Sequence, residues 1–253
     1  MLSALFDAQC GRDPWAALSD PERDFLERTG LFVPDASVPD EVTFDATFDA
    51  TAVASAAIPP DRLELLKEDL RRDGLALQRG FVGGAALAAM RQYYRRLVAE
   101  GHVQNGGNAG EPCRWVLHND PLSRAMHPAL VAPMSAIAGE PLKPSFSYLL
   151  VYLEGASVER HRDRAQCAVT AIVQVDFDPE PTGATPWPLR FGRGPEMVPK
   201  MLNDPLDVTL ALGDLLVFRG TEVEHFREPL TCGRSSTSLA FCFVAEDFSG
   251  PRD

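Results

Sequence analysis

Two kinds of hydrophobic pattern divide this chain into a helical part and a β-rich part. In the first part, Leu63, Leu66 and Leu70 recur at spacings of three and four residues, which place them on one face of an α-helix. Gly74 follows at a position typical of a helix end, because glycine adopts the left-handed conformation of a C-cap without steric cost. The pattern therefore predicts a helix that begins near Asp61 and ends near Gly74.

A short strand and a second helix are predicted next. Residues 75–78 form a short β-prone run, and residues 84–100 carry apolar side chains on one helical stripe before Gly101 ends the pattern. The stripe consists of Leu87, Met90, Tyr94 and Leu97. We expect both helices to buttress a sheet.

The rest of the chain is dominated by short β-prone runs that Pro, Gly and Asp clusters separate. These runs are residues 114–117, 148–153, 168–177, 208–212, 215–218 and 239–244. Many short strands without intervening helices are typical of a sandwich or barrel. The sequence therefore predicts a mainly β fold with flanking helices, of jelly-roll type.

The N-terminal 60 residues differ from the rest of the chain in composition and in hydrophobic pattern. Ser19 can cap a helix that runs to about Thr29, and Glu22 lies three residues later, as in a capping box. The remainder up to residue 60 is rich in Pro, Asp, Ala and Thr and shows no periodicity. We expect residues 1–60 to be a helical and irregular extension and residues 61–253 to form the β domain with its helices.

Composition and charge narrow the function. The 253 residues include 24 Lys and Arg against 36 Asp and Glu, a formal charge of -12 that argues against binding nucleic acid. The five cysteines form no C-x-x-C pair, which suggests neither a zinc knuckle nor a disulfide framework and fits a reducing cytosol. No apolar run approaches the ~18 residues of a membrane span. We expect a soluble cytoplasmic protein whose acidic surface is compatible with cationic partners.

A candidate metal site comes from three residues. On a β-strand, successive side chains alternate faces, so His161 and Asp163 should project to the same side. His225 would complete a set of two histidines and one carboxylate, which leaves the opposite positions of a metal ion open. This arrangement predicts an iron site suited to oxygen chemistry.

Other basic groups are expected at the surface. Arg160, Arg162 and Arg164 alternate with the predicted ligands and should form an outward, solvated row. His102 and His127 are expected to be exposed or capping groups.

Two further motifs are interpreted as unrelated to the site. His118-x-Asp120 repeats the ligand pattern, but Pro121 follows directly, which indicates that Asp120 caps a helix. The string His161-Arg162-Asp163 also occurs in protein kinase catalytic loops, but Ala168 stands where those loops have a magnesium-binding Asn.

Three local motifs carry a resemblance to a known family. They are Tyr152-x-x-Gly155 with His161-x-Asp163 after it, residues 213–218 ahead of His225, and Gly233-Arg234-Ser235-Ser236. Over roughly residues 75–244 the chain resembles the iron(II)- and 2-oxoglutarate-dependent oxygenases of the prolyl 4-hydroxylase type. The resemblance implies a double-stranded β-helix core, which is a jelly-roll or cupin-like barrel.

The resemblance also implies roles for individual residues. His161, Asp163 and His225 would bind Fe(II), which leaves three coordination positions for 2-oxoglutarate and dioxygen. Arg234 would hold the far carboxylate of 2-oxoglutarate, with hydroxyl groups from Ser236 and Tyr152.

Two of these assignments have competitors. Arg227 lies two residues from His225 and competes with Arg234 as the anion holder, but we expect it to lie too close to the iron to reach the far carboxylate. Tyr148 and Tyr152 share one strand face, so either could line the pocket.

The implied activity is that of a dioxygenase, an oxidoreductase that couples decarboxylation of 2-oxoglutarate to hydroxylation of a C–H bond. The expected substrate is an amino acid, a peptide or a small natural product. Halogenating relatives lack the metal-binding carboxylate, so Asp163 favours hydroxylation. Two alternatives remain: a non-catalytic β-helix protein that binds a metal or a 2-oxo acid as a sensor or interaction module, and a cupin-like enzyme with another metal and no co-substrate. Oligomeric state is left open.

Overall fold

The computed structural model describes residues 58–105, 113–192 and 205–252 of the chain. The helix expected over residues 19–29 and nearly all of the expected N-terminal extension lie outside these described residues.

Within the described residues, the strands form a sheet of seven and a sheet of four, and every pairing is antiparallel. The larger sheet has the order β1 (Leu75–Gln78), β9 (Leu215–Phe218), β6 (Val169–Asp178), β11 (Ser235–Ala245), β4 (Leu142–Leu153), β3 (Arg114–His118) and β2 (Gln104–Asn105). The smaller sheet has the order β5 (Val158–His161), β10 (His225–Arg227), β7 (Leu189–Phe191) and β8 (Leu206–Val208).

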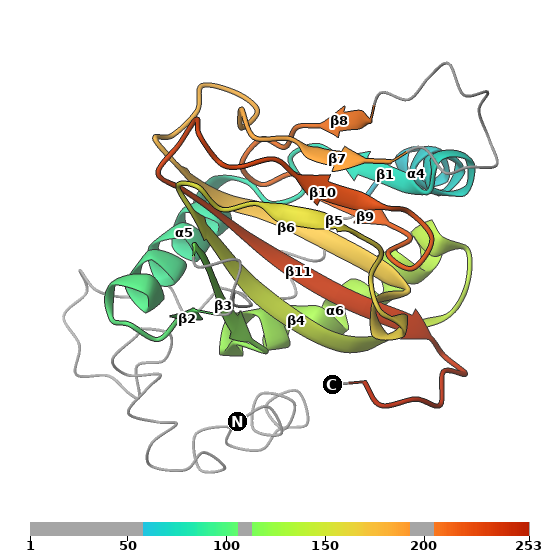
Figure 1. The fold of residues 1–253 in the computed structure, drawn as a ribbon. Coiled ribbons are helices and arrows are strands. Elements are labelled where there is room, and N and C mark those ends of the chain that lie inside the picture. Colours follow the sequence, from blue (N-terminus) through green and yellow to red (C-terminus); the bar gives the residue numbers. More distant parts are fainter. Residues whose placement is uncertain (1–57, 106–112, 193–204, 253) are drawn as a thin grey trace, which may run out of the picture.

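The molecule is built in three layers (Figure 1). The smaller sheet covers one face of the larger sheet, and the helices α4 (Pro60–Asp73), α5 (Gly84–Ala99) and α6 (Pro121–Ala138) cover the other. The expectation of a mainly β fold with flanking helices and a double-stranded β-helix core is therefore confirmed.

The larger sheet is buried on both faces, and its strand β4, which lies between β11 and β3, illustrates how. Leu149 and Val151 pack against the helices, whereas Leu150 and Tyr152 point between the two sheets. Because strand side chains alternate, neighbouring residues serve different layers. Burying each large apolar side chain contributes about 1.5–3 kcal/mol.

The two helices expected from the leucine and stripe patterns are present. Leu66 and Leu70 of α4 are completely buried, and Gly74 caps the helix with a left-handed backbone and donates its N–H to the Leu70 carbonyl. Met90 and Leu97 of α5 are likewise completely buried. No helix in the described part of the chain is long and apolar enough to cross a lipid bilayer.

Helix α6 was not predicted, although its start was. Asp120 accepts hydrogen bonds from the backbone N–H groups of Leu122 and Ser123, as expected of a helix cap. Two prolines inside the helix, Pro128 and Pro133, hide the helical pattern, because proline normally interrupts a helix. The strand expected over residues 208–212 is also largely wrong, since β8 ends at Val208.

His127 of α6 is buried, so the expectation that it would be exposed was wrong. Its ring packs against Phe241 and Phe243 with centroid distances of 5.4 and 4.7 Å, and its Nε2 lies 3.1 Å from the Cys242 carbonyl oxygen. Burial lowers the pKa of His127 to about 4 from 6.5, and the bond to Cys242 only partly opposes this.

This burial predicts a loss of stability in acid. Between pH 6.5 and about 4 the unfolded chain binds a proton at His127 that the folded protein does not. The stabilisation is therefore complete above pH 6.5 and is lost as the pH falls through the lower value, by about 3 kcal/mol in total. Urea unfolding across this range, compared for the wild type and His127→Phe, isolates the effect, because phenylalanine fills the site without titrating. Parallel pH dependence in the two proteins would contradict the prediction.

Candidate metal centre

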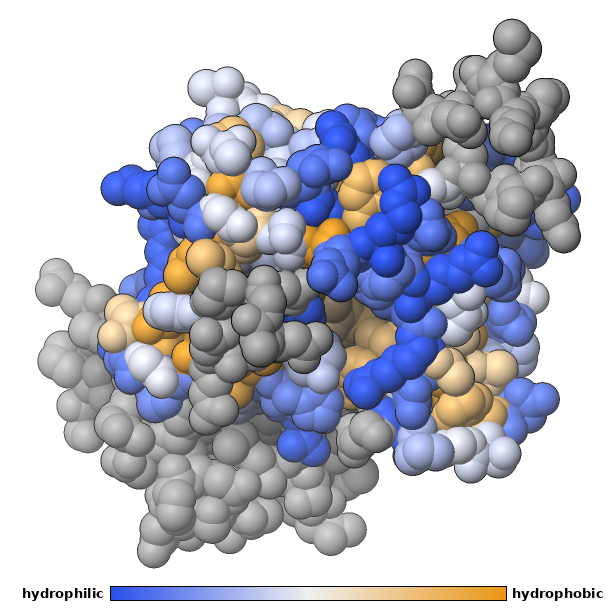
Figure 2. All heavy atoms as spheres, in the orientation of Figure 1, coloured by the Kyte–Doolittle hydropathy of each residue, from blue (hydrophilic) through white to orange (hydrophobic). Residues whose placement is uncertain are grey.

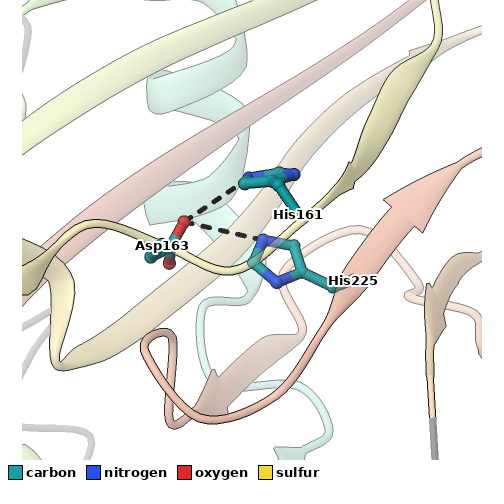
Figure 3. Close-up of side chains that lie close together, drawn as sticks. All are labelled: His161, Asp163 and His225. Carbon is teal, nitrogen blue, oxygen red and sulfur yellow. Dashed lines mark ion pairs between the residues drawn. The ribbon is translucent and has the colours of Figure 1, made fainter.

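The three predicted ligands lie together between the sheets (Figure 3). His161 ends β5, and His225 begins β10 directly opposite it in the antiparallel register. One carboxylate oxygen of Asp163, Oδ1, lies 3.6 Å from Nε2 of each histidine. Available donor atoms of all three residues lie within 4.8 Å of one another.

Asp163 reaches this position from a loop and not from a strand, because β5 ends at His161. Its backbone N–H donates to the Gly220 carbonyl, and the Thr170 hydroxyl donates to Oδ2 of its carboxylate over 2.7 Å. Gly220 leaves no room for a larger residue, since a Cβ there would collide with Asp163 Oδ2 and with the Cys167 carbonyl. The carboxylate is thus held from one side with Oδ1 directed at the histidines.

Backbone carbonyls fix the tautomers of both histidines. Nδ1 of His161 lies 2.7 Å from the Glu159 oxygen, and Nδ1 of His225 lies 3.2 Å from the Val223 oxygen. A carbonyl only accepts, so each Nδ1 carries the proton and each Nε2 presents its lone pair to the site. Metal-binding histidines commonly have such a partner on the second nitrogen.

The electrostatics favour the metal-binding forms of Asp163 and His225, whereas at His161 they favour the protonated form, from which a metal ion would displace the proton. Burial alone would raise the pKa of Asp163, but His161, the charge of His225 and the Thr170 hydroxyl outweigh burial and lower it. Burial lowers the pKa of His225, against the attraction of Asp163. The interaction with Asp163 raises the pKa of the more exposed His161.

The donor set fits a divalent transition metal. Donors about 2.1 Å from one ion and about 90–120° apart around it lie roughly 3.0–3.6 Å from one another, which agrees with the separations from Asp163 Oδ1. Two imidazoles and one carboxylate, with no thiolate, are typical of non-haem Fe(II) sites that keep open positions.

A cavity of about 370 Å³ adjoins the three ligands. Its walls come from the facing sides of both sheets and include Tyr148, Leu150, Tyr152, Ile172 and Phe218. Figure 2 shows the surface hollowed near the middle of this face, with apolar atoms inside and hydrophilic residues along the rim.

Arg227 lies in this cavity, on the same strand as His225. It is 5% exposed, its guanidinium donates to the Trp187 carbonyl over 2.9 Å, and its Cζ lies 4.2 Å from the centre of the Trp187 ring. No carboxylate of a described residue pairs with it. Burial lowers the pKa of Arg227 to about 10, so the group stays charged at neutral pH.

The structure does not bring Arg234 to the cavity. Its side chain is 75% exposed and forms an ion pair of 2.7 Å with Asp178 at the end of the sheet. Ser236 is buried and accepts a hydrogen bond from Gln174 over 3.2 Å, and it does not line the cavity. Ser238, two residues further along β11, lines the cavity in its place. The two competing tyrosines, Tyr148 and Tyr152, both line the cavity.

Two arginines that sequence reasoning missed line the cavity mouth. Arg162 and Arg164 were expected to point outward with Arg160, but strand alternation ends with β5, and the loop turns both toward the cavity. Arg160 does point away, where it forms an ion pair of 2.7 Å with Glu224. The clustering of arginines around His161 and Asp163 in the sequence was the signal that could have indicated a positively charged cavity mouth.

No protein-family model matches this sequence, and no curated protein matches it in sequence either. Solved structures do match in fold. A prolyl-4-hydroxylase of Pseudomonas putida has 24% identity and a TM-score of 0.57, with 72% of this chain and 98% of that chain covered. The epimerase SnoN of nogalamycin biosynthesis, in complex with Fe3+, alpha ketoglutarate and nogalamycin RO, has 18% identity and a TM-score of 0.58, with 74% and 84% covered.

A third similar structure is HygX of Streptomyces hygroscopicus with nickel and 2-oxoglutarate bound. It has 14% identity and a TM-score of 0.55, with 76% of this chain and 89% of that chain covered. These similarities establish that the chain has the fold of iron- and 2-oxoglutarate-dependent oxygenases, which agrees with the fold that its motifs imply.

The hydrogen bond from Thr170 predicts an effect on metal affinity. Thr170→Val keeps the shape but removes the donor that orients Asp163, and loss of such an outer partner typically costs 10- to 100-fold in affinity. We expect a decrease of about this size when Mn²⁺ or Ni²⁺ is titrated into the metal-free protein. Thr170→Ser, which retains the hydroxyl, is the matched control. Equal affinities for the valine and serine variants would show that the bond does not support the site.

Proposed function

We propose that this protein is an iron(II)- and 2-oxoglutarate-dependent oxygenase. The observation that carries the proposal is the placement of two complementary sites in one cavity: a set of metal donors and a buried arginine without a carboxylate partner among the described residues. A ligand that chelates a metal with one end and carries a second carboxylate at the other matches both sites. The fold shared with 2-oxoglutarate-dependent enzymes supports this assignment.

In this proposal His161, Asp163 and His225 hold Fe(II). The histidine rings are oriented by backbone carbonyls and the carboxylate is held by Thr170, so these three side chains would bind the ion without first rotating. Bound iron and 2-oxoglutarate would supply the oxidising power: dioxygen is consumed, 2-oxoglutarate becomes succinate and carbon dioxide, and one oxygen atom enters the substrate.

Arg227, in place of Arg234, would hold the far carboxylate of 2-oxoglutarate. A buried guanidinium without a counter-charge is costly, and a carboxylate offsets that cost with two parallel hydrogen bonds. Trp187 stacks beneath the guanidinium and orients it. Tyr152, whose ring packs against Trp187 with a centroid distance of 5.2 Å, is suitably placed to assist through its hydroxyl.

The apolar walls have a separate role. Leu150, Ile172 and Phe218 line the space beside the ligands and exclude water from it. Exclusion of water strengthens the polar interactions at the centre and protects a reactive oxidant from side reactions.

We further propose that the outcome is hydroxylation of a small molecule in the cytoplasm. The carboxylate ligand Asp163 occupies the position that halogenation would require to be empty. Enzymes of similar fold include a prolyl-4-hydroxylase, the epimerase SnoN and the carbocyclase SnoK, so the fold itself allows several outcomes. Similar structures with nogalamycin RO and with hygromycin B bound favour a small-molecule substrate over a peptide.

Removal of a metal ligand should abolish turnover. We expect Asp163→Ala and His161→Ala to release succinate from 2-oxoglutarate at no more than the protein-free rate, because two remaining donors hold Fe(II) poorly. Succinate release with added Fe(II), measured beside metal content, is the assay. Arg160→Gln, a surface change nearby, is the control. Succinate made at the wild-type rate by either ligand variant would refute the iron assignment, and none made by the wild type would favour the non-catalytic alternative.

The two candidate anion-holding arginines can be separated directly. Removing one partner of a buried charge pair costs about 3–5 kcal/mol, so Arg227→Met should raise the dissociation constant for 2-oxoglutarate by about 100-fold or more. Arg234→Met, at an exposed pair with Asp178, should leave it nearly unchanged. Titration of 2-oxoglutarate into the metal-loaded protein gives both values. A large effect of Arg234→Met with none of Arg227→Met would reverse the assignment.

A further inference from the structure

The cavity has the opposite charge from the protein around it. The chain carries 24 Lys and Arg against 36 Asp and Glu. Among the described residues that line the cavity there are four arginines and a single carboxylate, that of Asp163. The arginines are Arg114, Arg162, Arg164 and Arg227. A positive cavity in an acidic protein concentrates anions at one place on its surface.

The arginines elsewhere are mostly neutralised by the protein itself. Ion pairs with carboxylates hold, for example, Arg71, Arg79, Arg91, Arg95, Arg190 and Arg219. Arg160, in the same short segment as the rim arginines, pairs with Glu224. Neither Arg162 nor Arg164 pairs with a carboxylate of any described residue, although acidic residues outnumber basic ones in the chain.

The position of Arg164 is fixed by an aromatic ring and not by an acid. Its Cζ lies 4.5 Å from the centre of the Phe146 ring, and Phe146 also lines the cavity. A guanidinium stacked on a ring leaves its N–H edge free to donate in the plane. Arg114, the first residue of β3, also lines the cavity, and its charge acts on His161. Positive groups from β3 and from the loop after β5 therefore line the cavity that holds the metal site.

The proposed co-substrate does not account for this surplus charge. The formal charges of a divalent metal, Asp163, Arg227 and dianionic 2-oxoglutarate cancel. Arg162 and Arg164 then remain without an anion at the entrance through which a second molecule would approach the metal. We propose that the primary substrate is itself an anion, a carboxylate or a phosphate ester, which Arg162 and Arg164 bind at the cavity mouth.

This inference rests on the proposed function for the role of the bound molecule as substrate, and it replaces the expectation of a cationic partner that the overall charge suggested. Arg162 and Arg164 act as specificity residues in it: they select the charge of the substrate and hold it over the metal. The same two side chains would accept a carboxylate or a phosphate ester, so the test includes a probe of each class.

The test uses matched pairs of charged and neutral probes. The protein is loaded with Zn²⁺, which has no redox chemistry, and saturated with 2-oxoglutarate so that Arg227 is occupied. Binding of benzoate is compared with benzamide, and binding of phenyl phosphate with phenol, by ligand-observed NMR. We expect the anion of at least one pair to bind at least about fivefold more tightly than its neutral partner, the size of one favourable exposed charge contact.

Variants identify the groups responsible. Arg162→Gln and Arg164→Gln should each reduce the preference for the anion, and the double variant should abolish it. Arg160→Gln removes the same charge from the same segment and should leave the preference intact. Both rim side chains are exposed, so these substitutions leave the core untouched.

Three results would overturn the inference: equal binding of charged and neutral probes in both pairs, a preference that survives in the double variant, or an equal loss with Arg160→Gln. The proposed function is judged separately from 2-oxoglutarate binding in the same samples. If 2-oxoglutarate fails to bind while Arg162 and Arg164 still select anions, the anion site stands and the oxygenase assignment falls. If 2-oxoglutarate binds and no anion preference exists, only the present inference falls.

Discussion

The antiparallel pairing of β5 with β10 is the constraint on which the candidate centre depends. It sets His161 opposite His225 and, after a shift in register, Arg227 opposite Val158. One short ladder therefore brings two metal donors and the buried cation to the same cavity, although His161 and His225 are 64 positions apart in the sequence. The third donor, Asp163, comes from the loop that follows β5, where its backbone N–H donates to the Gly220 carbonyl.

The polar side chains of the site are held in place by other groups of the protein. Thr170 supports the carboxylate of Asp163, backbone carbonyls fix the protons of both histidines, and Trp187 supports the guanidinium of Arg227. Each of these polar groups is therefore oriented by a neighbouring group of the protein before any ligand binds. Such pre-organisation means that little rearrangement opposes binding, at the expense of local stability when no ligand is bound.

The spacing of side chains in the sequence predicted those features of the fold and site that depend on neighbouring residues. Leu66 and Leu70 revealed a helix because its buried face repeats with the helical period, and the spacing of His161 and Asp163 predicted that these two side chains lie together. Helix α6 escaped because packing against the sheet overrides the effect of its prolines. The choice of Arg227 over Arg234 depends on which side chain enters the cavity, and the inward turn of Arg162 depends on where β5 ends. The spacing of residues in the sequence predicts neither of these two features, because both depend on the tertiary structure.

The alternation of side chains along β4 has a consequence for how such a protein can change over time. Leu149 and Val151 belong to the helix-facing core, whereas Leu150 between them lines the cavity. Exchanging a cavity residue alters the shape presented to a substrate while the helix packing that keeps the sheet folded stays as it was. A single strand thus interleaves residues that are free to diversify with residues that are not, so new specificities can arise without a new fold.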